Sequence, residues 1–288
     1  MKNSGHVSKT MLVVAVTALV GGATSIANAI EPCGDFGECK VLIETNASDG
    51  DMGFHFLMDG DDLIRAAIYA PNHRKIFYDG ARGPLREQYL TETFVESAEP
   101  LCFDPLDDDD LENDEDDFVT LEDFVDRWQD GTYTFVGIGD GWEFSFGQTT
   151  LGFDFPAAPN LDAEDLFGFD GSIISWGAGD DLGECADYEE LMDLVDEGVL
   201  PVHPANVTVV EWEVVFEADI PGNLKYSVRV PGNISPRQVT VPADFLASLP
   251  ADTPAKIEVG AIGTGDNATF SEEGDICVNE DEGCEEEE

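Results

Sequence analysis

The sequence predicts a mainly β protein built from two antiparallel β-sandwich domains, with short helices and acidic loops. Short runs rich in β-branched and aromatic residues are separated by turn sequences such as Asp59-Gly60-Asp61 and Pro71-Asn72, a spacing that suits a sandwich. The length of 288 residues suggests two domains. A hydrophobic content of 42% provides enough apolar surface for their cores.

The first 29 residues are expected to form a secretory signal peptide. Lys2 and Lys9 flank a short polar start, the apolar run 11–20 follows, and Ala27-Asn28-Ala29 offers a small-residue cleavage site before Ile30. The apolar run is shorter than the roughly 20 residues that span a bilayer, so a retained membrane anchor is the weaker interpretation. We therefore expect a secreted or periplasmic protein without membrane insertion.

A large negative charge limits the classes of partner. The chain carries 62 acidic and 13 basic residues, a net charge of −49, and loss of Lys2 and Lys9 with the signal peptide leaves −51. Such a surface repels nucleic acid and anionic membranes and attracts cations. Three interpretations remain: adaptation to high salt, weak binding of divalent cations, and solubilisation of an exposed structural protein.

Six cysteines in an exported chain predict three disulfides, because the compartment is oxidising. Fifteen pairings are possible. We favour the pairing in which two disulfides close short loops, Cys33 with Cys39 and Cys277 with Cys284, and the remaining cysteines, Cys102 and Cys185, form the third. A metal site is the weaker alternative, since the spacings are not Cys-x-x-Cys and the neighbours are acids rather than histidines.

The N-terminal domain is expected over residues 30–157 and includes an acidic loop at 104–117. A helical or irregular stretch is expected at 85–99. Tyr133 follows a predicted helix and a Gly, so it is either a tyrosine-corner residue or an ordinary core tyrosine. Residues 155–159, Phe-Pro-Ala-Ala-Pro, predict a stiff, exposed hinge between the domains.

The second domain is expected over residues 158–278, with an insertion at 180–205 and an acidic tail at 279–288. A short helix is predicted within the insertion. The residues of its apolar face are Tyr188, Leu191, Met192, Leu194 and Val195.

Three features of this second half carry a family resemblance. Trp176 ends a predicted strand, the sequence Leu-Pro-Ala-Asp-Thr at 249–253 precedes the alternating run 257–262, and 265–267 supplies a final hairpin turn. In these features residues 158–278 resemble a fibronectin type III domain, so an immunoglobulin or fibronectin type III-like sandwich is implied. Ala255 stands where the family has its corner tyrosine. The layout of the whole chain is similar to uncharacterised secreted bacterial proteins with a C-terminal type III domain, which implies no activity.

Catalytic motifs are missing from the sequence. His55, His73 and His203 lie in unrelated contexts, and neither a Gly-x-Ser-x-Gly elbow nor a Gly-rich phosphate loop occurs. Paired carboxylates are so frequent that they carry no evidence for a glycosidase. We therefore predict no catalytic and no cofactor-binding residues.

Calcium is the cofactor that the sequence suggests most directly. Alternate acidic residues resemble the start of an EF-hand loop: Asp110, Glu112, Asp114 and Asp116. Glu115 stands where that loop needs Gly, so loose association of calcium is expected rather than a true EF-hand. Two other groups of acids could instead ligate an ion at a sandwich loop: Asp49 with Asp51, and Asp59 with Asp61 and Asp62. Ordinary turn residues are the favoured interpretation of both groups.

Five basic residues gather in a short span: Arg65, Arg74, Lys75, Arg82 and Arg86. Their face could dock the acidic loop or an anionic ligand, and internal pairing with acids is the favoured interpretation.

Three hypotheses for function follow. The leading one is an exported, non-enzymatic structural or binding module that presents its loops to a surface polymer, glycan or protein partner. The second is a calcium-responsive extracellular protein whose acidic loop orders on binding. The third is an unrecognised hydrolase, which would require carboxylates or a histidine that converge in a pocket.

Overall fold

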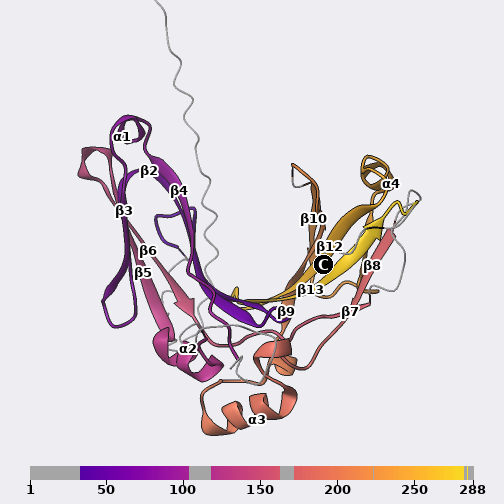
Figure 1. The fold of residues 1–288 in the computed structure, drawn as a ribbon. Coiled ribbons are helices and arrows are strands. Elements are labelled where there is room, and N and C mark those ends of the chain that lie inside the picture. Colours follow the sequence, from indigo (N-terminus) through magenta and orange to yellow (C-terminus); the bar gives the residue numbers. More distant parts are fainter. Residues whose placement is uncertain (1–32, 104–117, 163–171, 223, 282–283, 285–288) are drawn as a thin grey trace, which may run out of the picture. The chain divides into compact units, whose positions relative to one another are not determined.

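The structure, a computed structural model, describes residues 33–103, 118–162, 172–222, 224–281 and 284. These residues are mainly β with few and short helices, as predicted (Figure 1). The expected signal peptide and the acidic loop 104–117 lie outside the described residues, so both stay predictions.

The strands are β1 Glu38–Asn46, β2 Asp51–Tyr69, β3 Lys75–Gly80, β4 Leu90–Glu96, β5 Gly131–Gly139, β6 Phe144–Leu151, β7 Asn160–Asp162, β8 Ser172–Gly177, β9 Val209–Ala218, β10 Lys225–Pro231, β11 Gln238–Val241, β12 Thr253–Gly263 and β13 Ala268–Val278. The helices are α1 Pro84–Gln88, α2 Leu121–Arg127, α3 Tyr188–Glu197 and α4 Ala243–Leu246, with short 3-10 turns η2 Asp140–Trp142, η3 Gly183–Cys185 and η4 Pro204–Asn206.

The N-terminal strands are organised around the 19-residue strand β2. Its first part pairs with β1 and β4, and its second part pairs with β3 and β5. The turn predicted at Asp59-Gly60-Asp61 is therefore wrong, because β2 continues through it with a shift of register between Asp59 and Leu63. The expected helical or irregular stretch at 85–99 contains only the short α1 and is otherwise replaced by strand β4.

The C-terminal strands form a sandwich of two sheets. Strands β7, β8 and β11 form one sheet, and β10, β9, β12 and β13 adjoin one another in the other. A shared core lies between them, in which Trp176 of β8 packs at 5.8 Å from the ring of Trp212 of β9. The predicted hairpin at 265–267 joins β12 to β13, so this part has the sandwich architecture that the type III resemblance implied.

One hydrogen-bonded sheet contains strands from both halves of the chain. β1 pairs with β13 in parallel, with Glu44 opposite Ala268, and this pairing joins the four C-terminal strands to β2, β5 and β6. Sequence alone did not predict this junction. The expected exposed hinge is also corrected, because Phe155, Ala157 and Ala158 are buried. The division into domains at 157/158 stays a prediction.

The three disulfides have the predicted pairing: Cys33–Cys39, Cys102–Cys185 and Cys277–Cys284. The Cys102–Cys185 bridge attaches the insertion 180–205 to the N-terminal core. Leu182, Leu191 and Leu200 of the insertion are fully or almost fully buried in that core. The predicted helix is α3, whose Leu191, Leu194 and Val195 pack inward, whereas Tyr188 and Met192 are exposed.

Tyr133 has the geometry of a tyrosine corner. Its ring is buried, and its hydroxyl donates to the carbonyl oxygen of Gln129, four residues upstream, at 3.0 Å. Burial raises the pKa of Tyr133 to about 12, so the hydroxyl keeps its proton over the ordinary pH range. Of the two interpretations of this tyrosine, the corner is confirmed.

Among the residues that the structure describes, none of the helices has the length and apolar character needed to cross a bilayer.

The Cys102–Cys185 disulfide should contribute more stability than Cys33–Cys39, because it closes a much longer loop in the unfolded chain. Loop entropy predicts a loss of about 4.5 kcal/mol for Cys102→Ala with Cys185→Ala, against about 2.5 kcal/mol for Cys33→Ala with Cys39→Ala. The measurement is urea unfolding of both double variants beside the wild type. Equal losses would contradict the expectation.

Tyr133→Phe should lower the free energy of unfolding by about 1 kcal/mol, because the hydrogen bond to the Gln129 carbonyl is lost. Tyr226→Phe is the matched control, since Tyr226 is partly buried and makes no hydroxyl hydrogen bond in the described part of the structure. Chemical denaturation of the two variants compares them directly. A loss of equal size in both would remove the special role of Tyr133.

Candidate functional site

A groove of about 410 Å³ lies across β1, β2, β9, β12 and β13, and its lining is dominated by carboxylates. We call it the acidic groove. Its acidic residues are Glu44, Asp51, Glu96, Glu99, Glu213, Glu258 and Glu272. Its other lining residues are Asn46, Val215, Lys225 and Phe270. The parallel pairing of β1 with β13 brings these acids together from distant parts of the sequence.

A buried histidine lies between two of these carboxylates. His55 of β2 is 3% exposed, and its Nε2 is 3.0 Å from Oε1 of Glu99. Its Nδ1 is 3.8 Å from Oε2 of Glu44 on the neighbouring strand β1. The imidazole and the ring of Phe94 pack nearly perpendicular to each other, with centroids 5.9 Å apart. Each ring nitrogen of His55 therefore faces a different carboxylate.

The backbone holds Glu99 in place beside β2. Ser97, just after β4, donates to the carbonyl of Phe54 at 3.0 Å, and the carbonyl of Pro100 accepts from the amide of Met52 at 3.2 Å. Glu99 thus lies between two hydrogen bonds to β2. The side chain of Glu99 then reaches over Gly53. A Cβ at Gly53 would lie 2.6 Å from the Glu99 carboxylate and 2.8 Å from Nε2 of His55, so glycine makes the room for their contact.

Burial and mutual repulsion shift the titration of the groove. Burial raises the pKa of Glu44, and the charges of Glu99, Glu96 and Glu213 add to this, while His55 opposes it. The pKa of Asp51 is raised to about 6, first by burial and then by the charges of Glu99 and Asp49. Protons are therefore held in the groove at a pH where exposed carboxylates have lost them.

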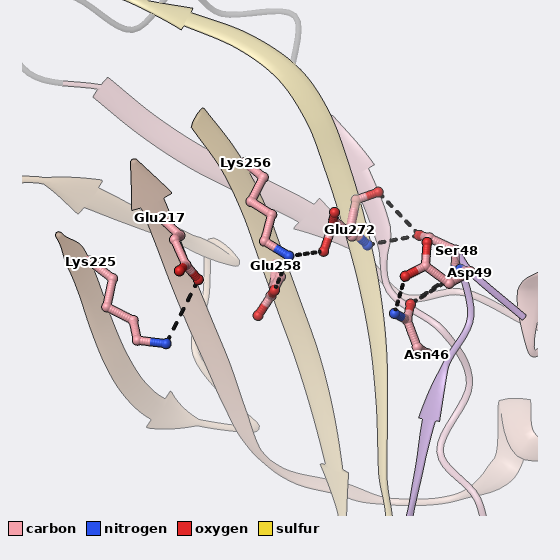
Figure 2. A network of polar contacts seen from close by, with 8 residues as sticks. All are labelled: Asn46, Ser48, Asp49, Glu217, Lys225, Lys256, Glu258 and Glu272. Atoms are coloured by element: carbon pink, nitrogen blue, oxygen red, sulfur yellow. Dashed lines mark hydrogen bonds and ion pairs between the residues drawn. The ribbon is translucent and has the colours of Figure 1, made fainter. Parts of the chain in front are cut away.

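Basic residues offset part of this charge on the C-terminal side of the groove, where Arg229 Nη2 lies 2.7 Å from Oε2 of Glu213. Lys256 Nζ lies 2.7 Å from Oε2 of Glu272 and 3.0 Å from Oε1 of Glu258, as Figure 2 shows. The hydrogen bond with Glu272 raises the pKa of Lys256, which stays charged. The carboxyl of Glu272 is nevertheless harder to ionise than usual, because burial raises its pKa and Lys256 compensates only in part.

Glu44, His55 and Glu99 could together hold a metal ion. Each offers one ligand atom, and these atoms lie within 4.8 Å of one another. One imidazole nitrogen with two carboxylates suits zinc or a similar transition ion, whereas calcium takes six to eight oxygens. A bound cation would also reduce the repulsion among the neighbouring acids.

The acids named from the sequence have different outcomes. Asp49 accepts from the amide of Asn46 at 2.8 Å, as expected of a turn residue, whereas Asp51 lies in the acidic groove (Figure 2 shows the Asn46–Asp49 contact). Three other acids on β2 join no candidate ligand cluster among the described residues: Asp59, Asp61 and Asp62. The predicted calcium ligands lie outside the described residues and stay a prediction: Asp110, Glu112, Asp114 and Asp116.

The site at His55 was missed by sequence analysis because its residues come from three separate segments. Residues 44, 55 and 99 have no motif spacing. The available signal was His55 itself, a polar residue inside the apolar run Phe54-His55-Phe56-Leu57-Met58. His203, in contrast, is a buried structural residue that accepts from the amide of Ala205 at 3.2 Å.

Comparisons with known proteins give no family. No family model matches the sequence, and no curated protein matches it. Among solved structures, the chicken interferon gamma receptor alpha chain is 7% identical, with 84% of this chain and 97% of that chain covered and a TM-score of 0.25. A tetra-tandem repeat in the extending region of a large adhesion protein is 9% identical, with 84% and 49% covered and a TM-score of 0.26. The BSP domain of a biofilm associated protein is 9% identical, with 86% and 30% covered and a TM-score of 0.22. Scores this low carry no argument about function.

Asp51→Asn should stabilise the protein at pH 8 and have almost no effect near pH 4. The folded pKa of about 6 exceeds the ordinary value of 3.8, so the folded chain binds the extra proton and loses stability as pH rises through 6. Partial exposure reduces this effect to roughly 1 kcal/mol, or about 2–4 °C in melting temperature.

Melting curves at the two pH values measure this difference. Asp61→Asn is the control, because Asp61 is an exposed residue of the same strand. A stabilisation by Asp51→Asn that is the same at both pH values would contradict the expectation.

Proposed function

We propose that this chain is an exported, non-enzymatic binding module that takes up a divalent metal ion at Glu44, His55 and Glu99. The observation that carries the proposal is the position of a buried imidazole between two carboxylates from different segments. Export is supported by the signal-peptide pattern of residues 1–29 and by the three disulfides. A protein or glycan remains the proposed class of macromolecular partner.

The ligand set favours a transition ion over calcium at this position. Zinc accepts imidazole nitrogen and carboxylate oxygen in a four-coordinate site, and three protein ligands leave one position open. The remaining acids of the groove supply oxygen atoms and a negative field that concentrates cations. The calcium-responsive alternative rests on the alternate acids at 110–116, which are independent of His55.

A hydrolase is the second candidate, because two carboxylates and a histidine do converge beside a groove. The raised pKa of Glu44 would suit a general acid. Metal binding is preferred because one ligand atom of each of Glu44, His55 and Glu99 lies within 4.8 Å of the other two. A screen of glycoside and ester hydrolysis, with Glu44→Gln as the inactive control, would separate the two.

His55→Gln should abolish one strong zinc site per chain. Calorimetric titration of EDTA-treated protein with zinc chloride measures it, and the matched control is His73→Gln, since His73 is exposed and does not belong to the ligand cluster. Weak binding to the many surface carboxylates should persist in both variants. A strong site that survives His55→Gln would contradict the proposal.

Gly53→Ala tests the geometry without removing a ligand. The added methyl group would push the Glu99 carboxylate away from His55. Zinc affinity should then fall by about tenfold or more, the range found when the support of a metal ligand is lost. Gly274→Ala is the control, because nothing lies within 4 Å of its added Cβ. Unchanged affinity in Gly53→Ala would mean that Glu99 is not a ligand.

A further inference from the structure

A second cavity has the opposite charge. It measures about 320 Å³ and lies where β3 ends and α1 begins. Arg65, Arg82 and Arg86 line it together with Tyr78 and Asp79, and we call it the arginine pocket. Its other lining residues are Ile64, Gly80 and Ala81. Three guanidinium groups thus share one cavity in a chain whose net charge is −49.

These three arginines have no ion-pair partner among the residues that the structure describes, which include many carboxylates. The ion pairs of the described residues involve other basic residues: Lys40, His55, Lys225, Arg229 and Lys256. Asp79, the one acid of the pocket lining, instead accepts from the amide of Gly80 at 2.6 Å. The internal pairing favoured from the sequence is therefore not found in the described residues.

The backbone around the pocket is held by local geometry. Ala81 donates to the carbonyl of Ile64 at 3.0 Å, which fixes the end of β3 against β2. Gly83 has φ 54° and ψ −135°, a conformation open to glycine and strained for other residues. Pro84 then starts α1, and Arg86 donates from its amide to the carbonyl of Gly83 at 3.0 Å. The backbone that bears Arg82 and Arg86 is therefore fixed in one turn between the end of β3 and the start of α1.

An aromatic surface adjoins the arginines on the same face of the sheet. Strand register aligns Tyr78 with Ala67, Val136 and Phe146 across β3, β2, β5 and β6. The next row aligns Arg65 with Ile138 and Phe144. Paired residues of antiparallel strands project from one face. The exposed fractions of Tyr78, Phe146 and Phe144 are 55%, 47% and 69%, so this face presents aromatic rings to solvent beside the arginine pocket.

We propose that this surface binds an acidic sugar residue of a glycan, with its carboxylate in the arginine pocket and its ring against Tyr78 and the neighbouring aromatic face. Arginine binds carboxylates through two parallel hydrogen bonds, and the apolar C–H face of a sugar ring packs on an exposed aromatic ring. The net charge of −49 repels densely charged polyanions and leaves a ligand with sparse charge as the better match. This site shares no residue with the acidic groove, so it stands whether or not a metal binds there.

The test is calorimetric titration of the full chain with a sugar tetramer in which one residue is galacturonic acid and the other three are neutral, in about 0.15 M salt, where screening limits the long-range repulsion. EDTA is present, so the acidic groove holds no metal. The wild type should give saturable binding. Arg82→Ala combined with Arg86→Ala should weaken it by about tenfold or more, because charge-assisted hydrogen bonds are lost. Arg74→Ala is the matched control and should bind as the wild type, since Arg74 is exposed in the same segment and does not line the pocket.

Two further arms separate the acidic sugar from a simple anion. The methyl-esterified tetramer, which lacks the charge, should bind much more weakly than the free acid. Tyr78→Ala should weaken binding of the tetramer but leave the binding of inorganic sulfate unchanged. The proposal is overturned if the tetramer does not bind, if the double arginine variant binds as the wild type, or if sulfate binds as tightly as the tetramer.

Discussion

The buried side chain of Asn267 fixes the junction on which the acidic groove depends. Asn267 is fully buried in the turn between β12 and β13, where its Oδ1 accepts from the amide of Ile43 at 2.9 Å and its Nδ2 donates to the carbonyl of Gly152 at 2.8 Å. These bonds hold the start of β13 against β1, and the parallel pairing continues from there. Because of that pairing, Glu44 lies in the same groove as acids of β9, β12 and β13.

The acidic groove and the arginine pocket are two cavities of opposite predominant charge. The acidic groove gathers carboxylates whose pKa values are raised by burial, which means that the fold holds them together against their repulsion. The arginine pocket gathers three arginines and one acid, Asp79, and none of the three arginines makes an ion pair within the described residues. In the free chain, carboxylates of the groove and arginines of the pocket lack some of the opposite charges that would stabilise them. A ligand of the complementary charge could supply these interactions. Clusters of like charge destabilise the folded chain, and such clusters are typical of functional sites.

Local sequence patterns predicted the features that depend on neighbouring residues. The β class, the disulfide pairing and the helix within the insertion followed from spacing and composition, and the corner geometry of Tyr133 was one of two interpretations that the sequence left open. The failures are long-range. At Gly60 the strand β2 runs so close to Phe36 and Leu63 that an added Cβ would lie 2.8 and 2.9 Å from their side chains, and the burial of residues 155–159 depends on elements distant in the sequence. His55 looked isolated because its carboxylate partners come from two other segments.

The disulfide between Cys102 and Cys185 closes a covalent loop in the chain, because it joins two cysteines that are 83 residues apart in the sequence. A protease that cuts once anywhere between these two cysteines produces two polypeptides that remain one molecule. The N-terminal piece would keep its bond to the insertion, and through it to β9, β12 and β13. In non-reducing electrophoresis such a nicked protein would migrate as an intact chain, and a reductant would separate the two pieces. Cleavage between the two cysteines therefore need not release one piece from a surface or partner that holds the other.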